Sequence, residues 1–272
     1  MTTPPIRRFH AARVVSTHLR LGAMQELQYR THVWTYFIST IMAMFMSLAS
    51  VAVVYRQVDS LHGWSRDELL VVVGIFFIVS GIINGSIHRS LASFAADIRS
   101  GDFDYRLLKP IDAHLLSSIR SIDVWRIFDT VAGCILVGYA VWKLEAAGHG
   151  GTTATYLAAP LLLTLMLFML TGFWSLIAGF AFWTTRIEGA LYALDEMLDN
   201  IRWPITIFPP GLRLALTTIF PAGFAITVPT EALTGRLTPT LILTSIVVTV
   251  AMFGGARLLW AAGMRRYASA SS

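Results

Sequence analysis

The main pattern along the chain is an alternation of long apolar stretches with short polar segments. A helix needs about 20 apolar residues to cross the hydrocarbon core of a bilayer. Five stretches reach or approach that length, and they are residues 33–55, 69–87, 127–142, 156–183 and 240–264. The pattern therefore predicts five helices that span a membrane, joined by polar segments on either side of it.

A sixth segment, residues 187–203, has helical spacing but is too polar for hydropathy alone to mark it. Leu191, Leu194 and Leu198 share one face of such a helix, and Glu188, Asp195 and Asp199 fall on a separate stripe. This arrangement is typical of an amphipathic helix, either shielded inside a bundle or lying at an interface. We interpret it as the fifth of six spans, because the other possible crossing, within residues 205–230, is interrupted by prolines.

Five prolines lie between residues 204 and 229. Each removes a backbone hydrogen-bond donor, so no continuous helix can run through this part of the chain. Broken apolar helices at membrane depth persist only where protein buries them or where they line a cavity. We expect residues 204–235, with breaks at Pro204, Pro209 and Pro221, to form a re-entrant hairpin of two short helices.

Composition and charge also indicate a membrane environment. The 272 residues are 55% hydrophobic and 14% charged, whereas soluble domains have roughly 25% charged residues. The basic residues occur in short runs between apolar stretches, which suits membrane anchors and not nucleic acid. With six spans and both termini in the cytoplasm, most of the 21 Lys and Arg residues lie on the cytoplasmic side, as the positive-inside rule requires. We therefore expect membrane lipid around the protein and no nucleic acid.

The sequence contains little that could catalyse a reaction. A single cysteine excludes an internal disulfide, and the only lysines, Lys109 and Lys143, lie in no glycine-rich phosphate-binding loop. We expect this chain to bind no nucleotide, cofactor or metal. The alternative function is a membrane-embedded enzyme that uses Asp195, Glu196 and Asp199 as acid–base or metal groups. No histidine lies near these three in the sequence, which argues against a metal site.

The longest polar segment inside the chain, residues 88–126, is more apolar than a solvated loop needs to be. Residues 90–99 can form a short helix that Gly101 ends in the left-handed conformation, and Pro110 breaks the next turn. The large apolar side chains between these two breaks are Phe103, Tyr105, Leu107 and Leu108. We interpret them as anchors, for a partner or for the underside of the helical bundle. An idle solvated loop is the alternative.

Residues 101–110, with the sequence GDFDYRLLKP, resemble the first cytoplasmic loop of the ABC-2-type transporter permeases. That loop commonly reads R-x-G-T/D-L/F-x-x-L-L-x-x-P, and Arg99 stands at its start here. Asp102 and Phe103 occupy positions where Thr and Leu are frequent, and Pro110 comes one residue early.

Further resemblances cover the rest of the chain. The prolines from Trp203-Pro204 to Pro221, followed by Gly235, resemble the extracellular re-entrant region of the same family. The chain from Trp260 onward resembles a subgroup of its exporter permeases. The order and spacing of these motifs make the resemblance more specific than any one of them.

The resemblance implies a fold and partners. The fold is an all-α membrane protein with six transmembrane helices, an amphipathic connecting helix at residues 8–30, a cytoplasmic coupling helix and an extracellular re-entrant hairpin before the last span. Such permeases pair with a second copy or with a homologous permease chain, and export substrates across the bacterial cytoplasmic membrane. A dimer of separate ATPase subunits binds the ATP and Mg and supplies the energy.

The resemblance also assigns a mechanical role to the loop after the second span, which would contain the helix that docks on the ATPase. The coupling residues on this interpretation are Arg99, Gly101, Asp102, Asp104, Leu107, Leu108, Lys109 and Pro110.

Asp195 and Asp199 are four residues apart and share a helical stripe with Glu188. A charge at the membrane midplane costs about 2.5–3.5 kcal/mol, so such carboxylates usually face a cavity or a partner. One hypothesis is a translocation pathway that attracts cationic groups. The other is a hydrated interfacial helix whose carboxylates are neutralised by Arg202 or by another helix.

Overall fold

The computed structural model describes residues 24, 30–108, 112–118, 122–184, 187–200 and 202–267. The helices in these ranges are α2 (Arg30–Val54), α3 (Arg66–Ile82), α4 (Arg89–Ser100), α5 (Phe103–Leu107), α6 (Ala113–Ser118), α7 (Ile127–Ala146), α8 (Thr153–Gly179), α9 (Ile187–Asn200), α10 (Pro210–Thr218), α11 (Ala222–Leu233) and α12 (Pro239–Arg266). No β-strand occurs in the described residues, which confirms the all-α fold class. The connecting helix expected at residues 8–30 lies outside the described residues, apart from Met24 and Arg30.

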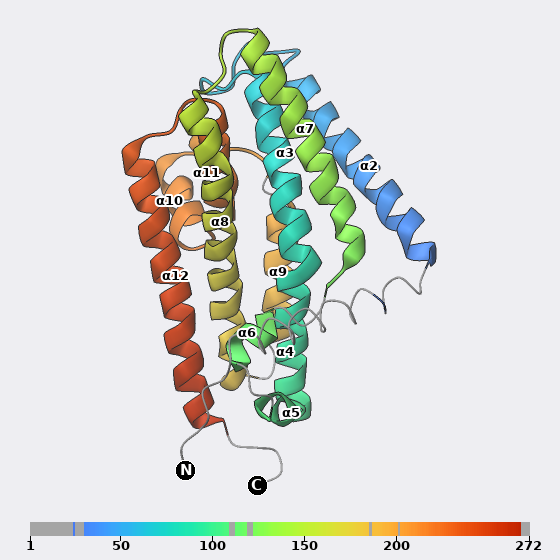
Figure 1. Cartoon of the computed structure of the whole chain (residues 1–272), viewed down its shortest axis with the longest axis vertical. Helices are drawn as coiled ribbons and strands as arrows, with labels where there is room; N and C mark the ends of the chain where they lie inside the picture. The colour runs from blue at the N-terminus through green and yellow to red at the C-terminus, as the bar shows by residue number, and fades with distance from the viewer. Residues whose placement is uncertain are drawn as a thin grey trace.

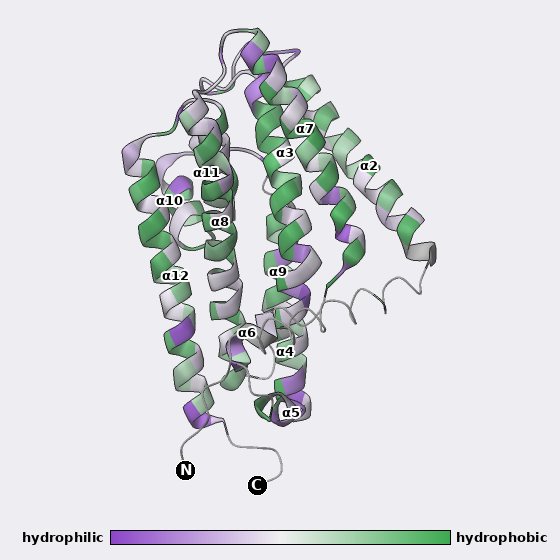
Figure 2. Ribbon diagram, viewed as in Figure 1, coloured by the Kyte–Doolittle hydropathy of each residue, from purple (hydrophilic) through white to green (hydrophobic). Residues whose placement is uncertain are grey.

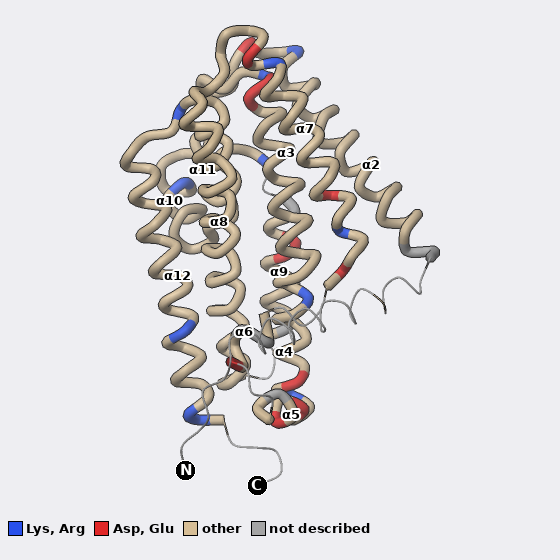
Figure 3. Tube along the Cα trace, in the orientation of Figure 1, with Lys and Arg blue, Asp and Glu red and all other residues tan. Residues whose placement is uncertain are grey.

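Five helices in the described residues are long and apolar enough to cross a membrane. One is the continuous helix from α3 to α4, and the other four are α2, α7, α8 and α12. The bent pair α10–α11 brings the number to six if it is counted as one span. Apolar residues cover these long helices (Figure 2), and charged residues gather toward the two ends of the bundle (Figure 3). The protein is therefore a multi-pass membrane protein. We call the end that holds α4, α5 and α6 the basal end, and the opposite end, with the α7–α8 loop, the distal end (Figure 1).

Helix α3 forms the centre of the bundle. Its first turn is fixed by a capping box, in which the Ser65 hydroxyl accepts from the Glu68 amide and the Glu68 carboxylate accepts from the Ser65 amide. Every residue from Glu68 to Gly81 is buried, as expected for a helix that is apolar on all sides. The α2 and α7 helices lie at one edge and α12 at the other (Figure 1), and all three expose many of their apolar side chains.

The second long helix continues beyond the point where its apolar stretch ends. The sequence predicts a span that ends near residue 87, but the chain stays helical through the π-helix Ile83–His88 and into α4. No proline interrupts this part of the chain, and Gly101, with a φ of 83°, ends α4. Hydropathy marks where a helix leaves the lipid and does not mark where it ends.

Glycines bring the long helices into backbone contact. A Cβ atom on Gly133 of α7 would lie 2.6 Å from the carbonyl oxygen of Gly74 in α3. One on Gly172 of α8 would lie 2.8 Å from the backbone of Phe253 in α12. Only glycine permits approaches this close, which are typical of helix pairs in membranes. The pairs α3–α7 and α8–α12 accordingly make the most extensive helix contacts in the bundle.

The chain from α9 to Thr206 runs antiparallel to α3. Asp195 contacts His88 after the end of α3, Arg202 lies over Phe76 midway along it, and Thr206 bonds Trp64 before its start. Helix α9 has 14 residues, and so a length of about 21 Å at 1.5 Å per residue, which is shorter than the hydrocarbon core of about 30 Å. The helix predicted over residues 187–203 thus ends earlier, at Asn200. The chain reaches Thr206 through residues 202–204, which are not helical, and the short 3₁₀ helix Ile205–Ile207.

Prolines determine the geometry of the segment that follows. Pro210 is the first residue of α10, Pro209 is its N-cap, and Pro221 precedes α11. The two helices meet at an angle of 98°, because a proline at the junction prevents one helix from continuing into the next. Helix α11 is almost wholly buried against α8 and α3, whereas α10 has no buried residue. Two short helices separated by a sharp bend match the pattern that the prolines predict.

Candidate coupling and translocation sites

The predicted coupling segment is a sharp turn followed by one short helix. Gly101 adopts the left-handed conformation after α4, and the Ser100 hydroxyl donates to the Asp102 carboxylate at 2.8 Å. This turn redirects the chain into α5. Arg99 and Asp102 are exposed beside it, whereas Lys109 and Pro110 lie outside the described residues.

Phe103 fixes α5 to the bundle. Its side chain is completely buried, with ring centroids at 5.3 Å from Phe94 of α4, 5.8 Å from Phe182 and 5.2 Å from Tyr267. Trp260 of α12 stacks on Phe94 at 4.3 Å. We call these five residues the basal aromatic cluster. They join the ends of α4, α8 and α12 to α5, and edge-to-face pairs of this kind add stability beyond the area that they bury.

The other large apolar residues of the segment point away from the protein. Tyr105 is 70% exposed, Leu107 is 45% exposed and Leu108 is 81% exposed. The sequence suggested anchors either for a partner or for the bundle. In the structure Phe103 packs against the bundle, whereas the other three side chains are exposed and available to a partner. Asp104 lies beside the Tyr267 hydroxyl, and burial together with this carboxylate raises the pKa of Tyr267.

Helix α6 is held against α12 by polar contacts. Arg257 of α12 donates to the Asp112 carboxylate at 2.9 Å, and its guanidinium lies 3.3 Å from Nδ1 of His114. The His114 ring also packs on Trp260, with centroids 4.5 Å apart. Burial, and then the Arg257 charge, lower the pKa of His114 to about 4. His114 is therefore neutral near pH 7 and packs as a polar aromatic residue.

The acidic face of α9 meets the π-helix at the basal end of α3. The Asp195 carboxylate lies 3.5 Å from Nδ1 of His88, and both side chains are largely buried. The ring of Tyr192 packs perpendicular to the His88 ring at 5.6 Å. The side chains of Glu188 and Asp199 lie outside the described residues. His88 was not predicted, because it is 107 positions from Asp195 in the chain and its own neighbours gave no signal.

Arg202 lies at the level of the middle of α3. Its guanidinium donates to the Ser47 hydroxyl of α2 at 2.9 Å and lies 5.2 Å from the ring centroid of Phe76. These contacts connect the chain after α9 to both α2 and α3. A guanidinium at membrane depth is costly unless polar and aromatic groups surround it. The sequence hypothesis paired Arg202 with the acidic stripe and did not predict its contacts with Ser47 and Phe76.

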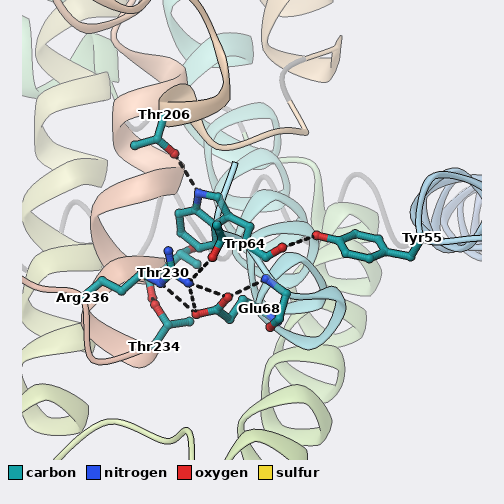
Figure 4. A network of polar contacts seen from close by, with 9 residues as sticks. Tyr55, Trp64, Glu68, Thr206, Thr230, Thr234 and Arg236 are labelled. Atoms are coloured by element: carbon teal, nitrogen blue, oxygen red, sulfur yellow. Dashed lines mark hydrogen bonds and ion pairs between the residues drawn. The ribbon is translucent and has the colours of Figure 1, made fainter. Parts of the chain in front are cut away.

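A polar cluster closes the distal end of the bundle (Figure 4). Arg236, which follows α11, makes two hydrogen bonds of 2.8 Å to the Glu68 carboxylate and one of 2.6 Å to the carbonyl of Gly63. Its guanidinium lies 4.7 Å from the ring centroid of Trp64, whose indole donates to Thr206 at 2.8 Å. We call Trp64, Glu68, Thr206 and Arg236 the distal clasp. It ties the chain on either side of the bent pair α10–α11 to the start of α3.

Replacing Arg236 with Gln is expected to lower the free energy of unfolding by about 2 kcal/mol, because a largely buried carboxylate loses two charge-assisted hydrogen bonds. Thermal unfolding of the purified protein, followed by fluorescence-detected gel filtration, measures this. Arg56→Gln is the matched control, since Arg56 is exposed near the same end of the bundle. Equal stability of the two variants would show that the clasp does not hold the distal end.

Within the described part of the chain, no group of three or more His, Cys, Asp or Glu side chains could hold a metal ion. Asp195 contacts one histidine, but no further ligand joins them in a metal-binding set.

The described residues form a helical bundle of five or six candidate spans, with a short helix at its basal end. Residues 41–271 match the model of a family described as ABC-2 family transporter protein, so the chain belongs to this family. It is therefore a membrane permease of an ABC transporter, as the loop motif and the prolines indicated. A search of curated proteins gave no match.

Proposed function

We propose that this permease exports a substrate across the bacterial cytoplasmic membrane, using ATP that a separate ABC ATPase hydrolyses. The observation that carries the proposal is the exposure of Tyr105 and Leu107 on α5, and of Leu108 directly after it, while Phe103 packs α5 against the bundle. Apolar side chains on the water-facing end of a membrane protein are costly unless a partner covers them. Because Phe103 packs α5 against the bundle, a movement of the ATPase at α5 would be passed on to the bundle.

On this proposal, the basal end faces the cytoplasm and receives a dimer of ATPase subunits. Asp102 and Asp104 of the coupling segment orient the contact, since charges at the rim of an interface affect register more than affinity. The basal aromatic cluster passes the movement of α5 to α4, α8 and α12. A second copy of the chain, or a homologous permease, completes the transporter.

The proposal also assigns a role to the chain from α9 to Thr206. We place the translocation pathway beside this segment, because the sequence puts Glu188, Asp195 and Asp199 on one helical stripe and Asp195 contacts His88 of the bundle. A hydrated pathway removes most of the cost of carboxylates at membrane depth, and the negative charge favours cationic groups on the substrate.

The test is ATP hydrolysis by the purified chain with and without the ABC ATPase that co-purifies with it. We expect no hydrolysis by the chain alone, because no lysine of the sequence lies in a phosphate-binding loop. We expect the ATPase to be stimulated when the two proteins share a lipid vesicle. Hydrolysis by the isolated chain, or an ATPase that is indifferent to it, would refute the proposal.

A further inference from the structure

A partly open cavity of about 440 Å³ lies between α2 and α7. Its walls are Thr35, Tyr36, Ser39, Thr40 and Ala43 of α2, with Arg126 and Asp129 from the start of α7. Cavities of this size are typical of small-molecule sites. Neither the coupling segment nor the chain from α9 to Thr206 contributes a residue to it.

The polar groups of the cavity are arranged as one cation beside one anion. Arg126 donates to the Asp129 carboxylate at 3.2 Å, and the Thr40 hydroxyl donates to the other oxygen of that carboxylate at 2.5 Å. The Arg126 guanidinium also lies 5.8 Å from the ring centroid of Tyr36. Both charged side chains line the open space, so the cavity presents opposite charges side by side with no net charge.

A second pair of charges lies directly beside the cavity. The Tyr36 hydroxyl donates to Asp123 at 2.8 Å, and Arg89 of α4 lies 3.6 Å from the same carboxylate. Among the described residues, the region thus holds two arginines and two aspartates, whose formal charges balance. An anionic ligand would meet an arginine whose charge a carboxylate already balances.

The cavity is placed where a lipid can reach it. Helices α2 and α7 form one edge of the bundle (Figure 1), and the cavity lies in the half of α2 nearer the basal end. Apolar side chains on both helices are exposed around it, including Ile38 and Ile41 on α2 and Val131 on α7. Polar residues inside a membrane-facing edge usually mark a functional site.

We propose that this cavity binds the headgroup of a zwitterionic phospholipid with a primary ammonium group, of the phosphatidylethanolamine type. Its phosphate lies against Arg126 and the hydroxyls of Thr35 and Ser39, and its ammonium lies against Asp129. The acyl chains follow the exposed apolar surface of α2 and α7. This inference goes beyond the proposed function and does not depend on the ATPase.

The chemistry of the walls discriminates between lipid headgroups. A phosphatidylglycerol headgroup carries net negative charge and has no cation to place against Asp129. A phosphatidylcholine headgroup has a cation, but its three methyl groups leave no N–H to donate to that carboxylate. A difference of one charge-assisted hydrogen bond corresponds to a preference of about tenfold.

The experiment is native mass spectrometry of the full-length protein after reconstitution into vesicles of equimolar phosphatidylethanolamine, phosphatidylcholine and phosphatidylglycerol. We expect one retained lipid per chain, with phosphatidylethanolamine favoured about tenfold over either competitor. Ser39→Phe, which places a ring in the cavity, should abolish retention. Leu243→Phe is the matched control, because Leu243 is exposed on α12, at the opposite edge of the bundle (Figure 1), and the change should leave retention unchanged.

A phosphatidylethanolamine that carries a photoreactive diazirine gives an independent measurement on the unaltered protein. We expect it to label peptides of α2 and α7, and unlabelled phosphatidylethanolamine to compete better than phosphatidylglycerol. Retention without headgroup preference, preference for phosphatidylglycerol, or labelling unaffected by Ser39→Phe would each overturn the proposal.

Discussion

Replacing Leu107 and Leu108 together with serine is expected to weaken binding of the partner ATPase roughly 100-fold. Both side chains are exposed, Leu107 as the last residue of α5 and Leu108 directly after it, so the proposed interface buries them when the ATPase docks. Burying a leucine contributes about 1.5–3 kcal/mol, and a loss of about 3 kcal/mol in total corresponds to that factor. Binding of the ATPase to the detergent-solubilised protein, measured by microscale thermophoresis, gives the value directly.

The folded permease should tolerate the double replacement, because neither side chain packs in the basal aromatic cluster. Met264→Ser is the matched control, since Met264 is an apolar residue that is 43% exposed near the basal end of α12. We expect the control to bind the ATPase as the original protein does. If the double variant bound with unchanged affinity and retained full stimulation, α5 would not be the coupling element.

Replacing Gly133 with leucine is expected to prevent α3 and α7 from packing and to abolish accumulation of the folded protein. A Cβ atom at this position would come within 2.8 Å of both the backbone and the side chain of Ile78, besides the contact with Gly74. The clash involves backbone atoms of a fully buried helix, which cannot move aside. Overpacking a core typically costs about 1–3 kcal/mol, and we expect roughly twice that cost here. The yield of monodisperse protein in detergent measures the effect.

Gly138→Leu is the matched control for this change. Gly138 lies five residues later in the same helix, and nothing lies within 4 Å of the Cβ atom that a side chain would add. Leucine also favours the helical conformation more than glycine does, so the control should fold at least as well as the original. Comparable yields of the two variants would show that the close contact between α3 and α7 is not required.

The membrane-spanning pattern was predictable because lipid imposes it on the sequence. Each long helix had to present about 20 apolar residues. Pro204, Pro209 and Pro221 had to interrupt any continuous helix after residue 203, although Pro229 lies inside α11. The left-handed conformation of Gly101 was also predictable, because helices commonly end at a glycine and Gly101 follows an amphipathic segment. These features depend on neighbours in sequence, which a single sequence displays.

The sites were less predictable because they depend on pairs far apart in the chain. Asp195 meets His88, Arg202 meets Ser47, and Arg236 meets Glu68, 168 positions away. Neither the spacing nor the hydropathy of one partner indicates the other. The loop motif marked residues 99–110 as a candidate coupling segment, but only tertiary packing shows that Phe103 faces the bundle while Leu108 faces outward.

The central claim is that the basal end of this permease docks on an ABC ATPase, and proximity cross-linking tests it most directly. Tyr105→Cys, in a Cys134→Ser background, places one thiol on α5, and His149→Cys places one in the exposed α7–α8 loop at the distal end. Each variant is labelled in native membranes with a maleimide that carries a diazirine, illuminated, and analysed by mass spectrometry. The account predicts cross-links from position 105 to an ABC ATPase and none from position 149. Cross-links to the ATPase from position 149, or none from position 105 in a complex that still hydrolyses ATP, would contradict it.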